Sequence, residues 1–191
     1  MDKKKGFNVY YLLLSEGTTE FNLFAYLTRN KFRGLFDGSN TKFSNRVEII
    51  KDGNQIVSQG KLDGVSTIAH FTSKHILIKA KYVGQRLFYF LDKDIDDSSA
   101  IGTLITQGGD IIQFIEYNSE HLLLRLAGKN PKNPSDFGNL NDFRTYCKKE
   151  FVTQFGKHAH KFKDADFDSV FKNVDDNDTK AALAELFSTL S

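Results

Sequence analysis

The residues from Val9 to Glu20 constrain this chain most, because a nearly continuous apolar run ends there in two acids. Phe7–Leu14 has few polar breaks, which is typical of a central strand covered on both faces in a parallel α/β sheet. Glu16 and Glu20 follow at once, separated by a short turn that contains Gly17. A carboxylate is costly to bury unless a metal ion or a basic group lies beside it. The two acids at the end of this strand therefore predict a site where a metal ion or a basic group lies beside them.

A second apolar run, at residues 87–91, also ends in acids. Asp92 and Asp94 are two positions apart, so in extended backbone both face the same way. The carboxyl ends of parallel strands lie at one edge of a sheet, and we expect these two acids to lie there with Glu16 and Glu20. Four such carboxylates repel one another unless divalent cations lie between them, and oxygen ligands favour Mg²⁺ or Mn²⁺.

Strand and helix signals alternate along most of the chain, which predicts an α/β fold with a mostly parallel four-stranded sheet and helices on both faces. The expected strands are residues 7–14, Arg46–Lys51, Arg86–Leu91 and 110–117. The expected helices lie at 18–30, 62–82, 119–128, 141–155, 165–171 and 179–190, with a short one within 97–109 and a loop at 31–45. Residues 1–128 would form the α/β core, and 129–191 a helical extension packed on the same domain.

Composition limits the class of protein. A chain of 191 residues with 40% hydrophobic and 26% charged residues fits one globular domain. One cysteine fits a reducing compartment, and no apolar run approaches the roughly 18 residues that span a bilayer. We expect a cytoplasmic protein without membrane contact.

Basic residues are concentrated locally, although the net charge is only +2. Residues 121–163 hold nine Lys or Arg against three acids, a local net charge of +6. Beside a metal site, such a segment predicts a groove that follows nucleic-acid phosphates, and a solvated helical face is the plainer interpretation. The candidate phosphate contacts are Lys129, Lys132, Lys148 and Lys149.

Other interpretations of the acids were weighed. The helix macrodipole alone would stabilise Glu16 and Glu20 by roughly 0.3–1 kcal/mol each, but it does not explain Asp92 and Asp94. A calcium-binding EF-hand is excluded, because its loop needs glycine at the sixth position and glutamate at the twelfth, where this chain has Asp97 and Thr103. An aspartyl nucleophile in a phosphatase stays a minor alternative.

The turn Ser15-Glu16-Gly17-Thr18-Thr19-Glu20 followed by Leu91-Asp92-Lys93-Asp94 resembles the Toprim domain of topoisomerases, bacterial primases and nucleases of the OLD type. The resemblance implies that Glu16, Asp92 and Asp94 bind divalent metal and act on phosphodiesters. A second glutamate in the turn, here Glu20, is a feature of OLD-like nucleases, where it serves a second metal. The segment 116–123 also resembles RloB-like, defence-associated Toprim proteins, which implies that Ser119 and Glu120 are further ligands.

The chain shows no zinc ribbon, no Walker A motif and no topoisomerase tyrosine context, so a small stand-alone Toprim protein is expected. The implied function is hydrolysis of nucleic acid with one or two Mg²⁺ or Mn²⁺ ions, in defence against phage or other foreign DNA. An ATPase or another defence protein is the implied partner. The alternative is a non-catalytic Toprim-like module that binds nucleic acid or protein.

Overall fold

The structure is a computed structural model of the chain. It describes residues 9–27, 41–44, 50–52, 55–57, 67–93 and 98–172, with side chains described for 13–27, 67–93 and 98–172. Asp94 and the helix expected at 179–190 lie outside the described residues, as does most of the loop expected at 31–45.

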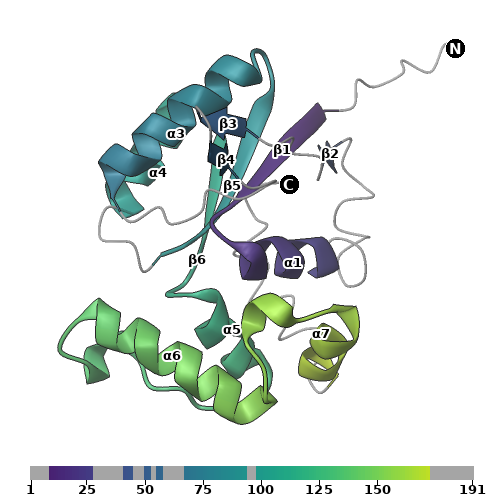
Figure 1. Ribbon diagram of the computed structural model, residues 1–191, viewed down its shortest axis with the longest axis vertical. Helices are drawn as coiled ribbons and strands as arrows, with labels where there is room; N and C mark the ends of the chain where they lie inside the picture. Colours follow the sequence, from purple (N-terminus) through teal and green to yellow (C-terminus); the bar gives the residue numbers. More distant parts are fainter. Residues whose placement is uncertain are drawn as a thin grey trace, which may run out of the picture.

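A parallel sheet forms the centre of the molecule (Figure 1). Its strands lie in the order β2 (Thr41–Ser44), β1 (Val9–Ser15), β5 (Arg86–Asp92) and β6 (Ile111–Ile115). Each neighbouring pair is parallel. The helices are α1 (Thr18–Tyr26), α3 (Ile68–Lys81), α4 (Ser98–Gln107), α5 (Ser119–Leu126), α6 (Leu140–Phe155) and α7 (Asp164–Phe171). The predicted α/β class and the parallel arrangement are confirmed.

Strand β5 shows why the sheet needs helices on both faces. Residues Leu87–Leu91 are all buried, so neither face of this strand meets water. Leu87, Tyr89 and Leu91 pack with side chains of α3 and α4, whereas Phe88 and Phe90 belong to the core on the opposite face. Figure 1 shows α3 and α4 on one side of the sheet and α1 on the other. A continuous apolar run thus corresponds to a strand covered on both sides.

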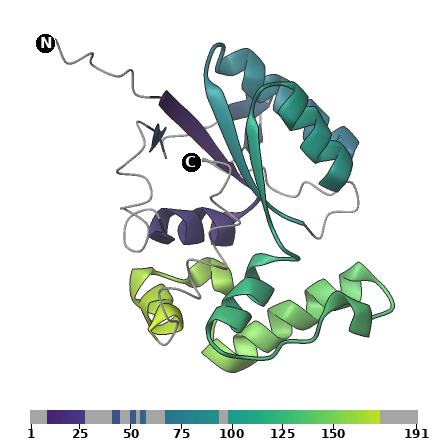
Figure 2. The same ribbon diagram turned by 180° about the vertical axis from the view of Figure 1, so that it is seen from behind.

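The C-terminal helices share the core of the α/β part. Phe24 and Tyr26 of α1 lie in one buried cluster with side chains of α5, α6 and α7. The ring of Tyr26 stacks on Phe167 and Phe171 of α7, with ring centroids 5.1 and 5.5 Å away. Its hydroxyl donates a hydrogen bond to Asp168 (2.7 Å). Figure 2 shows α5, α6 and α7 lying beyond the carboxyl ends of the strands.

The second predicted strand is a strand where the structure describes it, but its predicted place in the main sheet is wrong. Within the expected Arg46–Lys51, the described residues belong to β3 (Ile50–Asp52), which pairs antiparallel with β4 (Gln55–Val57) in a separate two-stranded sheet. The edge of the main sheet beside β1 is instead β2, in a stretch expected to be a loop. A four-residue strand that pairs with a single neighbour needs no alternation of apolar and polar residues. The hydrophobic pattern of the sequence therefore did not predict β2.

Two short 3-10 turns, η2 (Pro134–Asp136) and η3 (Ala159–Lys161), connect the C-terminal helices. Among the residues that the structure describes, no helix has the length and apolar character needed to cross a bilayer.

Candidate active site at the carboxyl ends of strands β1 and β5

The strand order places a switch point between β1 and β5. Strand β2 lies on one side of β1, and β5, which comes later in the chain, lies on the other. In open parallel sheets, ligands bind in the crevice outside the carboxyl ends of the strands at such a point. Glu16 directly follows β1 and Asp92 is the last residue of β5, so these two predicted acids lie there.

The backbone register brings Glu16 and Asp92 together. Ser15 is aligned with Phe90 of β5, and the Glu16 amide continues the pairing by donating to the Phe90 carbonyl (3.3 Å). The Asp92 amide in turn donates to Oε2 of Glu16 at 3.4 Å. Both residues are half-buried. The Glu16 carboxylate therefore bends across to the end of β5, where the Asp92 backbone holds it.

Glu20 takes a different direction. It lies in the first turn of α1 and is buried, with 5% of its surface exposed. Its Oε1 accepts a hydrogen bond from the Ser119 hydroxyl at 2.5 Å, which is within the range of charge-assisted O–H···O⁻ bonds. Ser119 begins α5 and is itself 1% exposed. This bond joins the first helix of the chain to the helix that follows β6.

Gly17 makes room for this arrangement. Its backbone is extended, so its conformation alone does not require glycine. A Cβ atom at this position would lie 2.7 Å from Oε2 of Glu20, closer than real side chains approach. A side chain at position 17 would therefore displace the Glu20 carboxylate, which folds back over the turn.

Ser119 is held by a strained turn at the end of β6. Tyr117 has a φ angle of +66°, in the left-handed region that bulky residues rarely adopt. Asn118 then caps α5, with its side-chain oxygen accepting from the His121 amide (2.9 Å). The Tyr117 ring meets His121 and Phe143 edge-on, at 5.0 and 5.7 Å between centroids. These contacts stabilise the turn that delivers Ser119 to Glu20.

Of the four predicted carboxylates, the structure describes Glu16, Glu20 and Asp92. In the described ranges, no group of three or more His, Cys, Asp or Glu is arranged to hold a metal ion. Glu16 and Asp92 meet, Glu20 is bonded to Ser119, and Asp94 lies outside these ranges. Glu120 lies half-buried in the first turn of α5. Metal binding by these acids stays a prediction.

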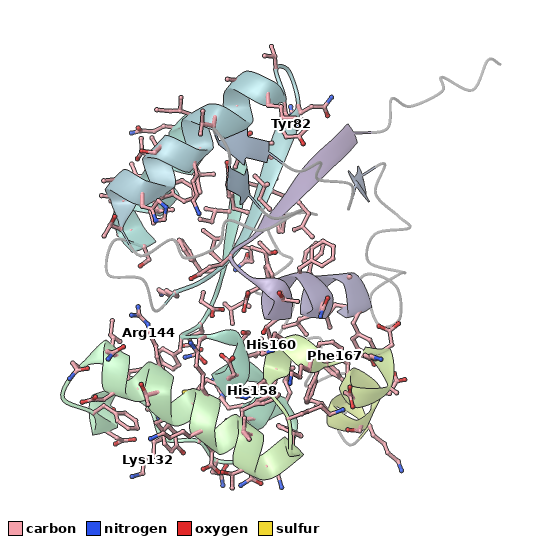
Figure 3. The ribbon with its side chains drawn as sticks, viewed as in Figure 1. Tyr82, Lys132, Arg144, His158, His160 and Phe167 are labelled. Carbon is pink, nitrogen blue, oxygen red and sulfur yellow. The ribbon has the colours of Figure 1, made fainter. Side chains whose placement is uncertain are left out.

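The predicted phosphate contacts lie on exposed surface. Lys129 follows α5, Lys132 lies between α5 and η2, and Lys148 and Lys149 lie on α6, all of them exposed. The Lys132 ammonium lies 5.9 Å from the centre of the Tyr146 ring. Figure 3 shows Lys132 on the side of α6 that faces away from the sheet.

Another basic residue is closer to the site. Figure 3 shows Arg144 on the side of α6 that faces the carboxyl ends of the strands. It lies one position after the buried Phe143, and it is half-buried. Arg144 is one of the nine basic residues between positions 121 and 163, and its charge alone does not distinguish it from the others. Helical spacing from the buried Phe143, Cys147 and Phe151 was the signal that could have separated it from the outer lysines.

His158 and His160 do not form part of the site. Both are exposed at η3, and their rings stack on each other with centroids 5.4 Å apart. Both are therefore surface histidines in a basic stretch.

No protein-family model, no curated protein and no solved structure matches this chain. The resemblance to Toprim proteins therefore rests on the motif residues, and the site rests on its own geometry.

Proposed function

We propose that this protein is a Toprim-type nuclease that hydrolyses phosphodiester bonds of nucleic acid with the help of a divalent metal ion. The observation that carries the proposal is the contact between the Glu16 carboxylate and the Asp92 amide at the β1–β5 switch point. The Glu16 carboxylate thereby lies at the end of the strand that carries Asp92, at the ligand-binding edge of a parallel sheet.

The donor set at this position fits Mg²⁺ or Mn²⁺. These ions take oxygen ligands, and Mg²⁺ is commonly held by one or two carboxylates together with water and substrate phosphate. Glu16 and Asp92 provide two such carboxylates, and Asp94 would extend the set. When bound, the ion would polarise the phosphate and lower the pKa of a water molecule. Glu20 would serve as a ligand through Oε2, because its Oε1 accepts from Ser119.

The residues around the ion have separate tasks. Glu16 would direct its carboxylate toward the ion, since the Asp92 amide fixes this carboxylate against the end of β5. Glu20 and Ser119 fix the turn from β1 into α1, so that Glu16 keeps its direction. Arg144 faces the same edge of the sheet and would attract the phosphate backbone. The outer lysines would add affinity that does not depend on sequence.

The test measures Mg²⁺- or Mn²⁺-dependent cleavage of plasmid DNA, single-stranded DNA and RNA by the wild type, Asp92→Asn and Glu16→Gln. Each variant should lose cleavage by at least about a hundredfold if its carboxylate serves catalysis. Asp136→Asn is the matched control, because Asp136 is an exposed acid in η2, outside the site. Equal cleavage by wild type and Asp92→Asn would contradict the proposal.

A second candidate is a non-catalytic module that binds nucleic acid or protein. It is favoured by the lack of a three-residue metal group in the described part of the chain and by the engagement of Glu20 with Ser119. Tight nucleic-acid binding, unchanged by chelation of divalent metal and without cleavage, would support this candidate.

The biological setting follows from the motif resemblance alone. We propose that the nuclease acts in defence against phage or other foreign DNA, with an ATPase or another defence protein as partner. Co-purification of the full chain with such a protein from its native cells would test this proposal.

A further inference from the structure

Strand β6 lies at one edge of the main sheet. It is the last strand in the order β2-β1-β5-β6, and in the described part of the chain it pairs only with β5. Residues Ile111–Phe114 are half-buried, whereas all of Leu87–Leu91 in β5 is buried. An exposed strand edge is a template for pairing with another strand.

The outward backbone groups of β6 can be assigned. The Ile115 carbonyl accepts from the Lys93 amide (2.9 Å), so it points toward β5. Because alternate residues of a strand bond to opposite neighbours, Ile112 and Phe114 turn their N–H and C=O groups away from β5. The Gln113 side-chain amide donates to the Phe114 carbonyl (3.1 Å), at the place where a further strand would bond.

The surface around this edge lacks charge. Between residues 98 and 115 the only charged side chain is Asp110, which is buried, although 26% of the whole chain is charged. Soluble proteins usually protect such an edge with lysine, proline or a bulge, and β6 has neither lysine nor proline. A groove of about 410 Å³ lies between α4 and β6, lined by Ile112, Phe114 and small polar residues of α4 with Lys93 at its end. Loss of charge is typical of the centre of a protein interface.

We propose that two copies of this chain associate through β6, pairing their edges antiparallel about a two-fold axis at Gln113. In this register Ile112 lies opposite Phe114 of the second copy, and each pair exchanges two backbone hydrogen bonds. Gln113 lies opposite Gln113 of the second copy, and the two sheets become one. The proposal is independent of the proposed nuclease activity.

The sequence of β6 favours a second copy over an unrelated peptide. Ile-Ile-Gln-Phe-Ile has the same polarity in both directions about Gln113, as a two-fold interface requires. Asp110 would lie opposite Glu116 of the second copy, and each has its own cation. Lys79 is 2.8 Å from Asp110, and Arg125 is 3.6 Å from Glu116.

The interface is built from one short strand and one face of α4, so it belongs to the small interfaces below roughly 1,200 Å². We therefore expect a dimer that dissociates on dilution. Sedimentation velocity of the full chain over a wide range of concentrations should show this equilibrium.

Charge variants at Gln113 test the register. Gln113→Lys and Gln113→Glu each place two like charges opposite one another across the axis, and each should weaken dimer formation at least about tenfold. A mixture of the two variants should restore it, because opposite charges then meet. Thr153→Lys, at an exposed position on α6, is the matched control and should dimerise like the wild type. Circular dichroism melts verify that every variant is folded.

Three results would overturn the proposal. The first is a wild type that stays monomeric at every concentration, which is also the result if a peptide of another protein occupies this edge. The second is a dimer that neither Gln113 variant weakens, and the third is a mixture of the two variants that dimerises no better than either alone.

Discussion

The two ends of the parallel sheet both bury acids, but they satisfy them differently. At the amino end of β6, Asp110 is 6% exposed and accepts from the Lys79 ammonium (2.8 Å) and from the Leu87 amide (3.0 Å). At the carboxyl end, Glu20 is 5% exposed and accepts from the Ser119 hydroxyl. In the described part of the chain no cation forms an ion pair with Glu20.

This difference fits the proposal that the amino end is structural and the carboxyl end binds metal. The buried charge of Asp110 is balanced by a lysine, and its second oxygen satisfies a buried amide, so the group serves folding. At the carboxyl end, the Ser119 hydroxyl fixes the direction of the Glu20 carboxylate without cancelling its charge, and the Asp92 amide donates to Glu16. Proteins place charge in this way where a cation or a substrate completes the site.

The largest effect on stability is expected at the amino end. Asp110→Ala should lower the free energy of unfolding by about 2–4 kcal/mol, because it leaves the buried Leu87 amide without its acceptor and Lys79 without its partner. Urea denaturation measures the change.

Two further variants, Asp110→Asn and Lys79→Met, separate the contributions of the hydrogen bond and the ion pair to this loss of stability. The first keeps an acceptor for Leu87, whereas the second leaves the buried Asp110 carboxylate without its cation and should cost about 3 kcal/mol. If Asp110→Ala were as stable as the wild type, Asp110 would not serve folding, and the proposed difference between the two ends of the sheet would be contradicted.

A smaller loss is expected at the joint between α1 and α5. Ser119→Ala leaves the buried Glu20 carboxylate without its donor and should cost about 1–3 kcal/mol. A double-mutant cycle with Glu20→Gln should give a coupling energy of about 1 kcal/mol or more. Additive losses in this cycle would mean that the two side chains do not act as a pair.

The two buried histidines make stability depend on pH at both ends. Burial lowers the pKa of His75, with Lys79 acting in the same direction and Asp110 opposing it. Burial likewise lowers the pKa of His121, with Arg125 acting in the same direction. The unfolded chain then binds more protons below its own histidine pKa of about 6.5, so stability is complete above this pH and falls as the pH decreases through it.

His75→Phe and His121→Phe should each flatten this dependence between about pH 7 and pH 5, measured by urea denaturation at each pH. The exposed His158→Phe is the matched control and should leave the slope unchanged. A wild type whose stability rises as the pH falls through this range would contradict the sign of both shifts.

The sequence predicted the centre of the fold better than its edges. Strands β1 and β5 are nearly continuous apolar runs and β6 is interrupted by Gln113, and this apolar character reflects a sheet that is covered on both faces. Strand β2 reads Thr-Lys-Phe-Ser and is held by backbone pairing with β1, which leaves no pattern in the side chains. The same limit caused Arg46–Lys51 to be assigned to the wrong sheet.

For the site, spacing indicated which acids share an edge but not where their side chains point. Glu16 and Asp92 lie together because parallel strands end at one edge, which is a rule of topology. Glu20 was expected to join them, and it instead bonds to a serine 99 positions away. Only the packing of α1 against α5 decides that direction, and no local pattern records it.

The smallest effect on stability, expected for Asp92→Asn and Glu16→Gln, is the most informative about the comparison. Both residues are half-buried, and both substitutions keep size and hydrogen-bonding atoms, so the free energy of unfolding should change by less than about 0.5 kcal/mol. A gain in stability is also consistent with an active site, since removing like charges from one edge relieves repulsion. A loss as large as that of Asp110→Ala would instead make Glu16 and Asp92 structural groups, and the two ends of the sheet would be equivalent. If urea denaturation gives an unchanged free energy of unfolding and metal-dependent cleavage is lost, these two acids serve the reaction and not the fold.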